Sequence, residues 1–258
     1  MPRFSANASM IFLEYDLLDR FAVAAREGFE AIELQFPYDT PAADLKDAKE
    51  DSGLEIAGIN IPVGDLSTGG RGNASIPGKE DEFKASVEVA YEYAEVCRPR
   101  TMNVLPGFPP LDEFEREQCL DVLAGNLCVA AEGLQELGVK VMTEAVNTVE
   151  RPGFLLDHTW QALDVIDRAG HENLAIEYDI YHMQIMEGDL VNTMRETLPR
   201  IGHIQFADTP GRHEPGTGEI NFPYIFEAVD EMGWDGFLGA EYIPTGRTED
   251  CLGWMPGR

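Results

Sequence analysis

Short apolar runs rich in β-branched residues alternate with longer amphipathic stretches along the whole chain. The stretches between the runs carry apolar residues at helical spacing, as in Leu17, Phe21 and Ala24, where Gly28 then predicts the helix end. This alternation is typical of βαβ units. Eight runs are predicted to be strands, near residues 4–11, 31–37, 55–61, 100–106, 139–146, 173–179, 202–208 and 236–243.

Eight such units in 258 residues predict one closed (β/α)8 barrel, or TIM barrel, that spans residues 1–258 as a single domain. The stretch after Arg247 is short, so we expect the eighth helix to be short or missing. An open doubly wound sheet is the alternative. It is disfavoured because no G-x-G-x-x-G fingerprint follows an early strand, and we therefore expect no nucleotide or redox cofactor.

The charge of the chain limits its partners. Acidic residues outnumber basic ones 47 to 19, for a formal net charge of −28. A phosphate backbone needs a basic footprint, so we expect no nucleic acid partner and no binding to anionic membranes. The N-terminal residues lack a signal-peptide pattern and no apolar run reaches membrane-spanning length, which predicts a cytoplasmic protein. The acidic excess suggests a saline habitat, and an anionic substrate would need arginines or a metal at its site.

Four oxygen-bearing side chains fall at the carboxyl ends of late strands. Side chains alternate along a strand, so Leu174, Ile176 and Tyr178 are expected to face the helices while Glu177 and Asp179 face inward. The same parity can place Glu144, Gln205 and Glu241 inside the barrel. Any one of them alone is more simply an ion-pair partner or a solvated strand end. When three carboxylates are buried together with an amide, either a cation must neutralise the carboxylates or their pKa values must rise. A divalent metal meets this need, and oxygen ligands suit Mg²⁺ or Mn²⁺ better than zinc.

Several segments resemble the hydroxypyruvate isomerase family, within the xylose isomerase-like TIM barrels. The resemblance runs through nearly the whole chain and is most specific in its last three blocks. The segments are A-N-A-S-M-I-F (6–12), E-L-Q-F-P-Y (33–38), N-I-P-V-G-D (60–65), E-A-V-N (144–147), Y-D-I-Y-H-M-Q (178–184), H-I-Q-F-A-D (203–208), G-R-H-E-P-G-T-G-E-I-N (211–221) and G-A-E-Y-I-P (239–244).

The resemblance implies specific roles for the residues that match the family's pattern. Glu144, Asp179, Gln205 and Glu241 would bind the metal, and Glu144 and Glu241 would also form the acid–base pair. His182, three residues after Asp179, would contact the substrate.

Arginines are the expected partners of a substrate carboxylate. Arg212 or Arg71 would hold it in bidentate fashion, although Arg71 could equally pin its own glycine-rich loop. The chain departs from the family at Asn103, where a histidine is usual, at Ala145, which replaces a proline, and at Glu177, which replaces a neutral residue. Asn103 is expected to line the pocket, and it bears on the identity of the substrate more than on the class of reaction.

The expected activity is a metal-assisted aldose–ketose isomerisation of a small anionic hydroxy-carbonyl acid. Hydroxypyruvate and 2-hydroxy-3-oxopropanoate (tartronate semialdehyde) would interconvert through a cis-enediol by proton transfer between two glutamates. A 2-oxo-tetronate isomerase, a ketose 3-epimerase, and a lyase or dehydratase remain open, as does a non-catalytic sugar-acid binding protein. A DNA-repair endonuclease of similar barrel type is disfavoured because it would need a histidine-rich cluster of several zinc ions. This chain has five histidines, and its negative charge would repel DNA. A homodimer or homotetramer is expected.

Overall fold

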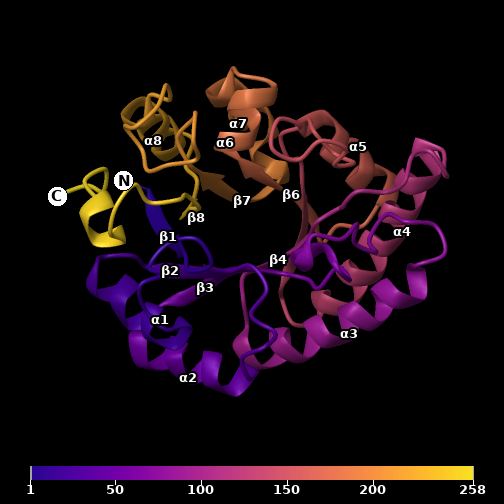
Figure 1. The fold of residues 1–258 in the computed structure, drawn as a ribbon, viewed down its shortest axis with the longest axis horizontal. Coiled ribbons are helices and arrows are strands. Elements are labelled where there is room, and N and C mark those ends of the chain that lie inside the picture. Colours follow the sequence, from indigo (N-terminus) through magenta and orange to yellow (C-terminus); the bar gives the residue numbers. More distant parts are fainter. Residues whose placement is uncertain (1, 258) are drawn as a thin grey trace.

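The strands close into a barrel in which every strand is parallel to its neighbours and β8 pairs with β1 (Figure 1). The computed structural model describes residues 2–257. All eight predicted strands are confirmed, although several end earlier than predicted, because the chain leaves the ladder to form loops at the carboxyl ends. The strands are β1 (Arg3–Asn7), β2 (Ala31–Leu34), β3 (Glu55–Asn60), β4 (Thr101–Val104), β5 (Lys140–Glu144), β6 (Leu174–Asp179), β7 (Ile201–Phe206) and β8 (Phe237–Ala240).

Helices surround the barrel as an outer layer (Figure 1). One α-helix follows each of the first five strands, two follow β6, and one follows β7. Within residues 2–257 only the 3₁₀ turn η3 (Thr248–Cys251) follows β8, which confirms that the eighth helix is short or missing. The α-helices are α1 (Leu17–Arg26), α2 (Ala42–Ser52), α3 (Glu80–Cys97), α4 (Arg116–Gln135), α5 (Thr159–Ala169), α6 (Ile180–Met186), α7 (Leu190–Thr197) and α8 (Phe222–Glu231). The remaining 3₁₀ turns are η1 (Leu66–Thr68) and η2 (Leu198–Arg200).

The C-terminal segment takes the place of the missing eighth helix. The Trp254 ring packs edge-on against Phe4 of β1 and Phe206 of β7, with centroid distances of 5.1 and 5.0 Å, and it also contacts Phe226 of α8. Such aromatic pairs add to the stabilisation that comes from burying the rings. The barrel is therefore covered between α8 and α1 without a regular helix.

Strand parity follows the expected pattern on β6. Leu174, Ile176 and Tyr178 belong to the apolar core between the barrel and the helices. Glu177 lines the pocket inside the barrel, and Asp179 is buried at the end of the strand. Among residues 2–257, no helix is long and apolar enough to cross a lipid bilayer.

The loop between β7 and α8 is held in a fixed shape by one buried carboxylate. Asp208 accepts hydrogen bonds from the backbone N–H groups of Thr209, Gly216, Gly218 and Ile220. An added Cβ at Gly218 would lie 2.1 Å from the Thr209 carbonyl oxygen, so this close approach requires glycine. The loop presents its arginine, Arg212, from a left-handed backbone conformation (φ 57°) toward the open end of the barrel.

Candidate active site

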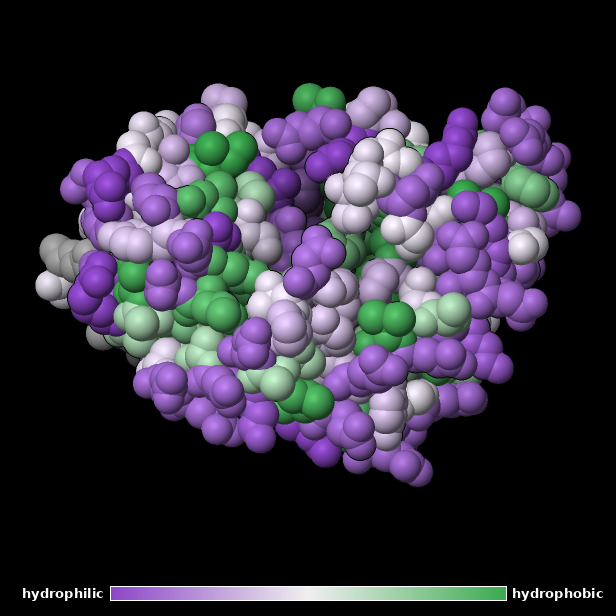
Figure 2. All heavy atoms as spheres, turned by 60° about the horizontal axis from the view of Figure 1, so that its bottom comes forward, coloured by the Kyte–Doolittle hydropathy of each residue, from purple (hydrophilic) through white to green (hydrophobic). Residues whose placement is uncertain are grey.

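A pocket opens at the carboxyl ends of the strands, the end at which barrel enzymes build their active sites. Figure 2 shows a hollow edged by hydrophilic side chains on the face that it presents. The lining includes three members of the predicted quartet, Glu144, Gln205 and Glu241. The fourth, Asp179, lies beside them, with Oδ2 3.5 Å from His182 Nε2 and 3.6 Å from Arg212 Nη2. The structure therefore brings the four residues together.

Glu241 follows β8 directly and receives hydrogen bonds from three elements. Its Oε1 accepts from Asn7 Nδ2 (2.9 Å) on β1 and from Gln35 Nε2 (2.7 Å) just after β2. Its Oε2 accepts from Arg212 Nη2 at 2.6 Å. Burial raises the pKa of Glu241 to about 7, although the charge of Arg212 acts in the opposite direction. This carboxyl group can therefore exchange a proton near neutral pH.

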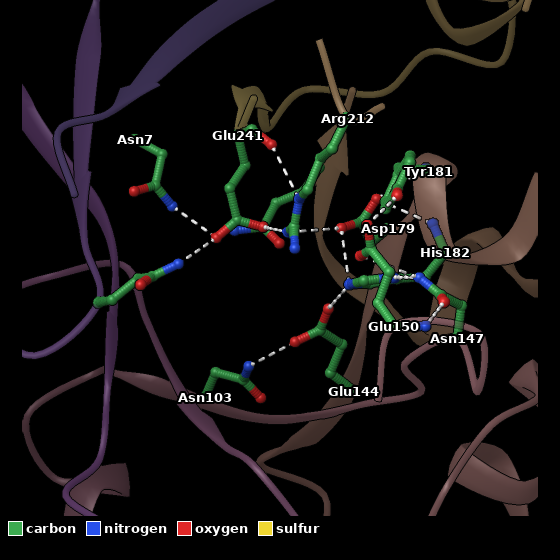
Figure 3. Close-up of polar contacts among 12 residues, drawn as sticks. Asn7, Asn103, Glu144, Asn147, Glu150, Asp179, Tyr181, His182, Arg212 and Glu241 are labelled. Atoms are coloured by element: carbon green, nitrogen blue, oxygen red, sulfur yellow. Dashed lines mark hydrogen bonds and ion pairs between the residues drawn. The ribbon is translucent and has the colours of Figure 1, made fainter. Parts of the chain in front are cut away.

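Glu144 ends β5 and occupies another side of the pocket (Figure 3). Its Oε2 accepts a hydrogen bond from Asn103 Nδ2 at 3.2 Å, and its Oε1 lies 3.8 Å from His182 Nε2. Burial, together with the negative charges of Asp179 and Glu241, raises the pKa of Glu144 well above its ordinary value. Asn103 thus lies in the pocket, as expected, and contacts a glutamate directly.

Asp179 ends β6 and caps the helix that follows. Its Oδ1 accepts from the backbone N–H groups of Tyr181 (2.7 Å) and His182 (3.4 Å). Its Oδ2 is buried and has no hydrogen-bond partner among residues 2–257. A buried carboxylate oxygen that accepts no hydrogen bond is costly in free energy, so this atom is suited to a cation. Glu144, Asp179 and His182 each offer a ligand atom, and these atoms lie within 4.8 Å of one another.

Gln205 on β7 is oriented by a residue that the sequence analysis missed. Glu33 Oε2 accepts from Gln205 Nε2 at 2.8 Å, and Glu33 Oε1 lies 2.9 Å from His203 Nε2 and accepts from Ser5 Oγ. Burial acts to raise the pKa of Glu33, but the His203 ring and these donors hold it below its ordinary value. The parity rule could have found Glu33, because it stands between the apolar Ile32 and Leu34.

Glu177 lies beside this network, and among residues 2–257 no side chain donates a hydrogen bond to its carboxyl group. It lines the pocket on β6, next to Glu144 in the register of the sheet. Burial and the surrounding carboxylates, Glu144 first, raise the pKa of Glu177 well above its ordinary value and so favour its protonated form.

Arg212 reaches from the β7–α8 loop into the middle of the carboxylates (Figure 3). Its Nη2 contacts Glu241 and Asp179, and its guanidinium carbon lies 5.3 Å from the centre of the Tyr181 ring. Burial opposes its charge, but the carboxylates outweigh that effect and raise the pKa of Arg212. The arginine therefore stays charged and offsets part of the negative charge of the site.

Two further arginines, Arg71 and Arg151, lie at the mouth of the pocket. Arg71 is exposed, and its side chain makes one long hydrogen bond, from Nη1 to the Phe108 carbonyl oxygen at 3.4 Å. Arg71 does not line the main pocket but a shallow depression beside it. Arg151, which the sequence analysis missed, lines both and has no acidic partner within 4 Å in the described part of the chain.

His182 on α6 faces the space between Glu144 and Asp179. It is 3% exposed, and its Nδ1 lies 2.7 Å from Asn147 Nδ2 in the loop after β5. Burial and the charge of Arg212 hold the pKa of His182 well below its ordinary value, so the ring is neutral near pH 7.

Comparison with known proteins connects this chain to a group of barrel enzymes. The sequence model described as "Xylose isomerase-like TIM barrel" matches residues 21–256. The chain is 46% identical over 255 residues to the hydroxypyruvate isomerase of Escherichia coli (strain K12), covering 99% of this chain and 98% of that protein. It is 41% identical over 255 residues to the 2-oxo-tetronate isomerase of Cupriavidus necator, with the same coverage of both chains. A crystal structure from Brucella melitensis described as "AP endonuclease, family 2" is 37% identical, with a TM-score of 0.94 over 98% of each chain.

Proposed function

This chain belongs to the xylose isomerase-like TIM barrel family, and we propose that it is a sugar-acid isomerase that interconverts hydroxypyruvate and 2-hydroxy-3-oxopropanoate. The observation that carries the proposal is the pair of buried glutamates, Glu144 and Glu241, that approach one pocket from β5 and β8 (Figure 3). Both have a raised pKa, which suits groups that accept and return protons near neutral pH. The full-length similarity to isomerases of small hydroxy acids supports the same assignment.

The donor set at the pocket suits a hard divalent cation. Glu144, Asp179 and Glu241 supply carboxylate oxygens, and Asp179 Oδ2 is the buried oxygen without a hydrogen bond. Gln205 directs its amide nitrogen at Glu33, which leaves its amide oxygen for the pocket. Oxygen ligands of this kind favour Mg²⁺ or Mn²⁺. When bound, the ion supplies Lewis-acid polarisation of the carbonyl and hydroxyl oxygens of the substrate.

The two glutamates would carry the carbon-bound proton. One glutamate removes a proton from the hydroxyl-bearing carbon of hydroxypyruvate, and the electron pair forms the double bond of a cis-enediol. A proton moves from the hydroxyl oxygen to the former carbonyl oxygen, and the second glutamate protonates the neighbouring carbon. Hydrogen only moves between adjacent positions, so no nucleotide or redox cofactor takes part.

Positive groups around the pocket would receive the carboxylate of the substrate. Arg212 lies closest to the glutamates but already contacts Glu241 and Asp179, so it also neutralises the site. Arg151 adds a cation at the pocket rim, and Arg71 lies farther out. His182 and Asn103 complete the proposed substrate contacts. The partner is thus a small anionic hydroxy-carbonyl acid, handled by a cytoplasmic enzyme that forms a homodimer or homotetramer.

Two rival functions have an observation in their favour. The Cupriavidus relative is named for 2-oxo-tetronate, which the same acid–base chemistry would serve. The Brucella structure is described as an endonuclease, but the net charge of −28 would repel a DNA backbone. We therefore retain only the 2-oxo-tetronate isomerase as the second candidate.

The test is to incubate the purified protein with hydroxypyruvate or with a 2-oxo-tetronate, each with Mn²⁺ and after chelation, and to follow the products by NMR. We expect 2-hydroxy-3-oxopropanoate from hydroxypyruvate only when the metal is present. Turnover of the 2-oxo-tetronate alone would show that it, and not hydroxypyruvate, is the substrate, with the proposed acid–base chemistry unchanged. A lack of turnover of both acids with Mn²⁺ present would overturn the proposed function.

A further inference from the structure

The buried side chain of Asn147 joins the loop after β5 to the histidine of the site. Asn147 has no exposed surface. Its Oδ1 accepts a hydrogen bond from the backbone N–H of Glu150 at 2.9 Å, and its Nδ2 lies 2.7 Å from His182 Nδ1 (Figure 3). The Glu150 carboxylate, 3.5 Å from Asn147 Nδ2, is consistent with the same orientation.

The Glu150 backbone fixes which end of the Asn147 amide faces the histidine. A backbone N–H can only donate, so the atom that it meets must be the amide oxygen, and the atom facing His182 must be the NH₂ group. An NH₂ group also only donates, so His182 Nδ1 has to accept. A nitrogen that accepts carries no proton, which excludes both the Nδ1–H tautomer and the doubly protonated ring. The remaining form is the neutral ring with its proton on Nε2.

His182 Nε2 points between two carboxylates of the pocket. It lies 3.5 Å from Asp179 Oδ2 and 3.8 Å from Glu144 Oε1, and Asp179 Oδ2 has no hydrogen bond in residues 2–257. The three side chains are spaced like a metal-binding group. A nitrogen that carries a proton has no lone pair for a metal, however. The spacing alone therefore wrongly suggests that His182 is a metal ligand.

We propose that Asn147 holds His182 as the Nε2–H tautomer, which makes His182 a hydrogen-bond donor in the substrate contact proposed above and removes the lone pair that a metal would need. The identity of the acceptor rests on the proposed function. His182 is then a catalytic residue that touches the substrate, and Asn147 is a positioning residue. A fixed N–H donor aimed at an oxygen that gains negative charge stabilises the enediol-forming step without adding a proton to the pocket.

Nitrogen NMR of the full-length protein labelled with ¹⁵N-histidine tests the tautomer directly. Long-range ¹H–¹⁵N spectra distinguish protonated from unprotonated ring nitrogens, and loss of one set of signals in His182→Gln assigns the residue. We expect an unprotonated Nδ1 and a protonated Nε2, both without metal and with saturating Mg²⁺. A protonated Nδ1 in the wild-type protein, or loss of the Nε2 proton when Mg²⁺ binds, would overturn the proposal.

Asn147→Asp tests the role of Asn147. The new carboxylate can only accept, so Nδ1 of His182 should gain a proton, and kcat should fall by about 10- to 100-fold, as for other residues that orient a site histidine. Asn192→Asp, which adds the same charge at an exposed position on α7, is the matched control and should leave the His182 spectrum unchanged. An unchanged Nδ1 signal in Asn147→Asp would show that Asn147 does not set the tautomer.

The affinity for a metal ion tests whether His182 is a hydrogen-bond donor or a metal ligand. The affinity for Mn²⁺, measured by calorimetry, should fall by less than about 100-fold in His182→Leu, whereas a larger loss would identify His182 as a ligand. These readings need no turnover. The proposed tautomer can therefore stand if the protein isomerises no sugar acid, and it can fail while the isomerase activity stands.

Discussion

Charged residues gather at both ends of the barrel, but in opposite ways. At the amino ends of the strands, Arg3 pairs with Glu30 and Glu55, and Arg100 pairs with Glu55. The two guanidinium groups also lie 4.2 and 4.6 Å from the centre of the Phe237 ring. These charges balance one another, and their side chains are 37–53% exposed. Pairs of this kind typically contribute at most about 1 kcal/mol each.

At the carboxyl ends the charges are buried and do not balance. One arginine, Arg212, lies among acidic residues that are each at most 7% exposed. Buried carboxylates whose charge is not compensated destabilise the folded state. Ionisable groups with strongly shifted pKa values cluster at functional sites. The acidic group consists of Glu33, Glu144, Glu177, Asp179 and Glu241. The comparison teaches that the charges at one end of the barrel compensate one another, whereas the other end concentrates the buried acids to which we assign cation binding and proton transfer.

The largest expected effect is on the rate of the reaction. Glu241→Gln or Glu144→Gln keeps the shape of the side chain but removes a proton acceptor, so kcat with hydroxypyruvate should fall by about 10²- to 10⁴-fold. Initial rates at saturating Mn²⁺ measure this. Glu30→Gln at the opposite end is the control and should leave kcat unchanged. A full rate in either pocket variant would end the proposed role of that glutamate.

Metal binding at the carboxyl end should stabilise the folded protein as a whole. Mn²⁺ at about 100 times its Kd should add about 2.7 kcal/mol to the free energy of unfolding and raise Tm by roughly 5–10 °C. Asp179→Asn retains an oxygen that can cap α6 but removes the charge of the carboxylate, so its Tm should respond much less. Thermal unfolding followed by circular dichroism gives both values. An equal shift in the variant would place the ion elsewhere.

The stability of the metal-free protein should depend on pH with a sign set by the buried acids. Burial raises the pKa of Glu241 to about 7 and that of Glu177 well above its ordinary value. The folded state then binds more protons than the unfolded state, so stability is greatest at low pH within this window and falls as pH rises from about 4 to about 7.

Urea unfolding of the chelated protein across this range measures the pH effect. Glu177→Gln removes one of the raised groups, so its free energy of unfolding should depend less on pH. The same dependence in wild type and variant would show that Glu177 contributes nothing to it.

The smallest expected effect is at the amino end. Arg100→Gln removes an exposed ion pair and a contact with the Phe237 ring, which should lower the free energy of unfolding by about 1 kcal/mol and leave kcat unchanged. Urea unfolding and initial rates check both. A loss of activity with unchanged stability would contradict the division of roles between the two ends.

The barrel and the four residues of the quartet were predictable because they depend on local patterns. Strand parity fixes which way Asp179 and Gln205 point, and parallel strands bring their carboxyl ends to one side. The same reasoning would have found Glu33 if it had been applied to β2.

Residues on loops could not be placed from parity. Arg212 contacts Glu241 because its backbone adopts a left-handed conformation in a loop that Asp208 holds in place. Asp208 accepts hydrogen bonds from backbone N–H groups up to twelve positions away in the sequence. Asn147 and Arg151 also lie outside regular structure, where the sequence gives no direction for a side chain. Sequence patterns therefore predict the scaffold and the carboxylates, whereas the orientation of the polar groups around them depends on tertiary contacts.

The most direct test of the account follows hydrogen at the reacting carbons. The protein with Mn²⁺ should convert hydroxypyruvate in D₂O to 2-hydroxy-3-oxopropanoate that carries deuterium from the solvent at C2, because one glutamate releases the original proton and the other supplies a new one. Product that forms at full rate but carries at C2 the hydrogen removed from C3 of the substrate would contradict proton transfer through two separate glutamates, Glu144 and Glu241.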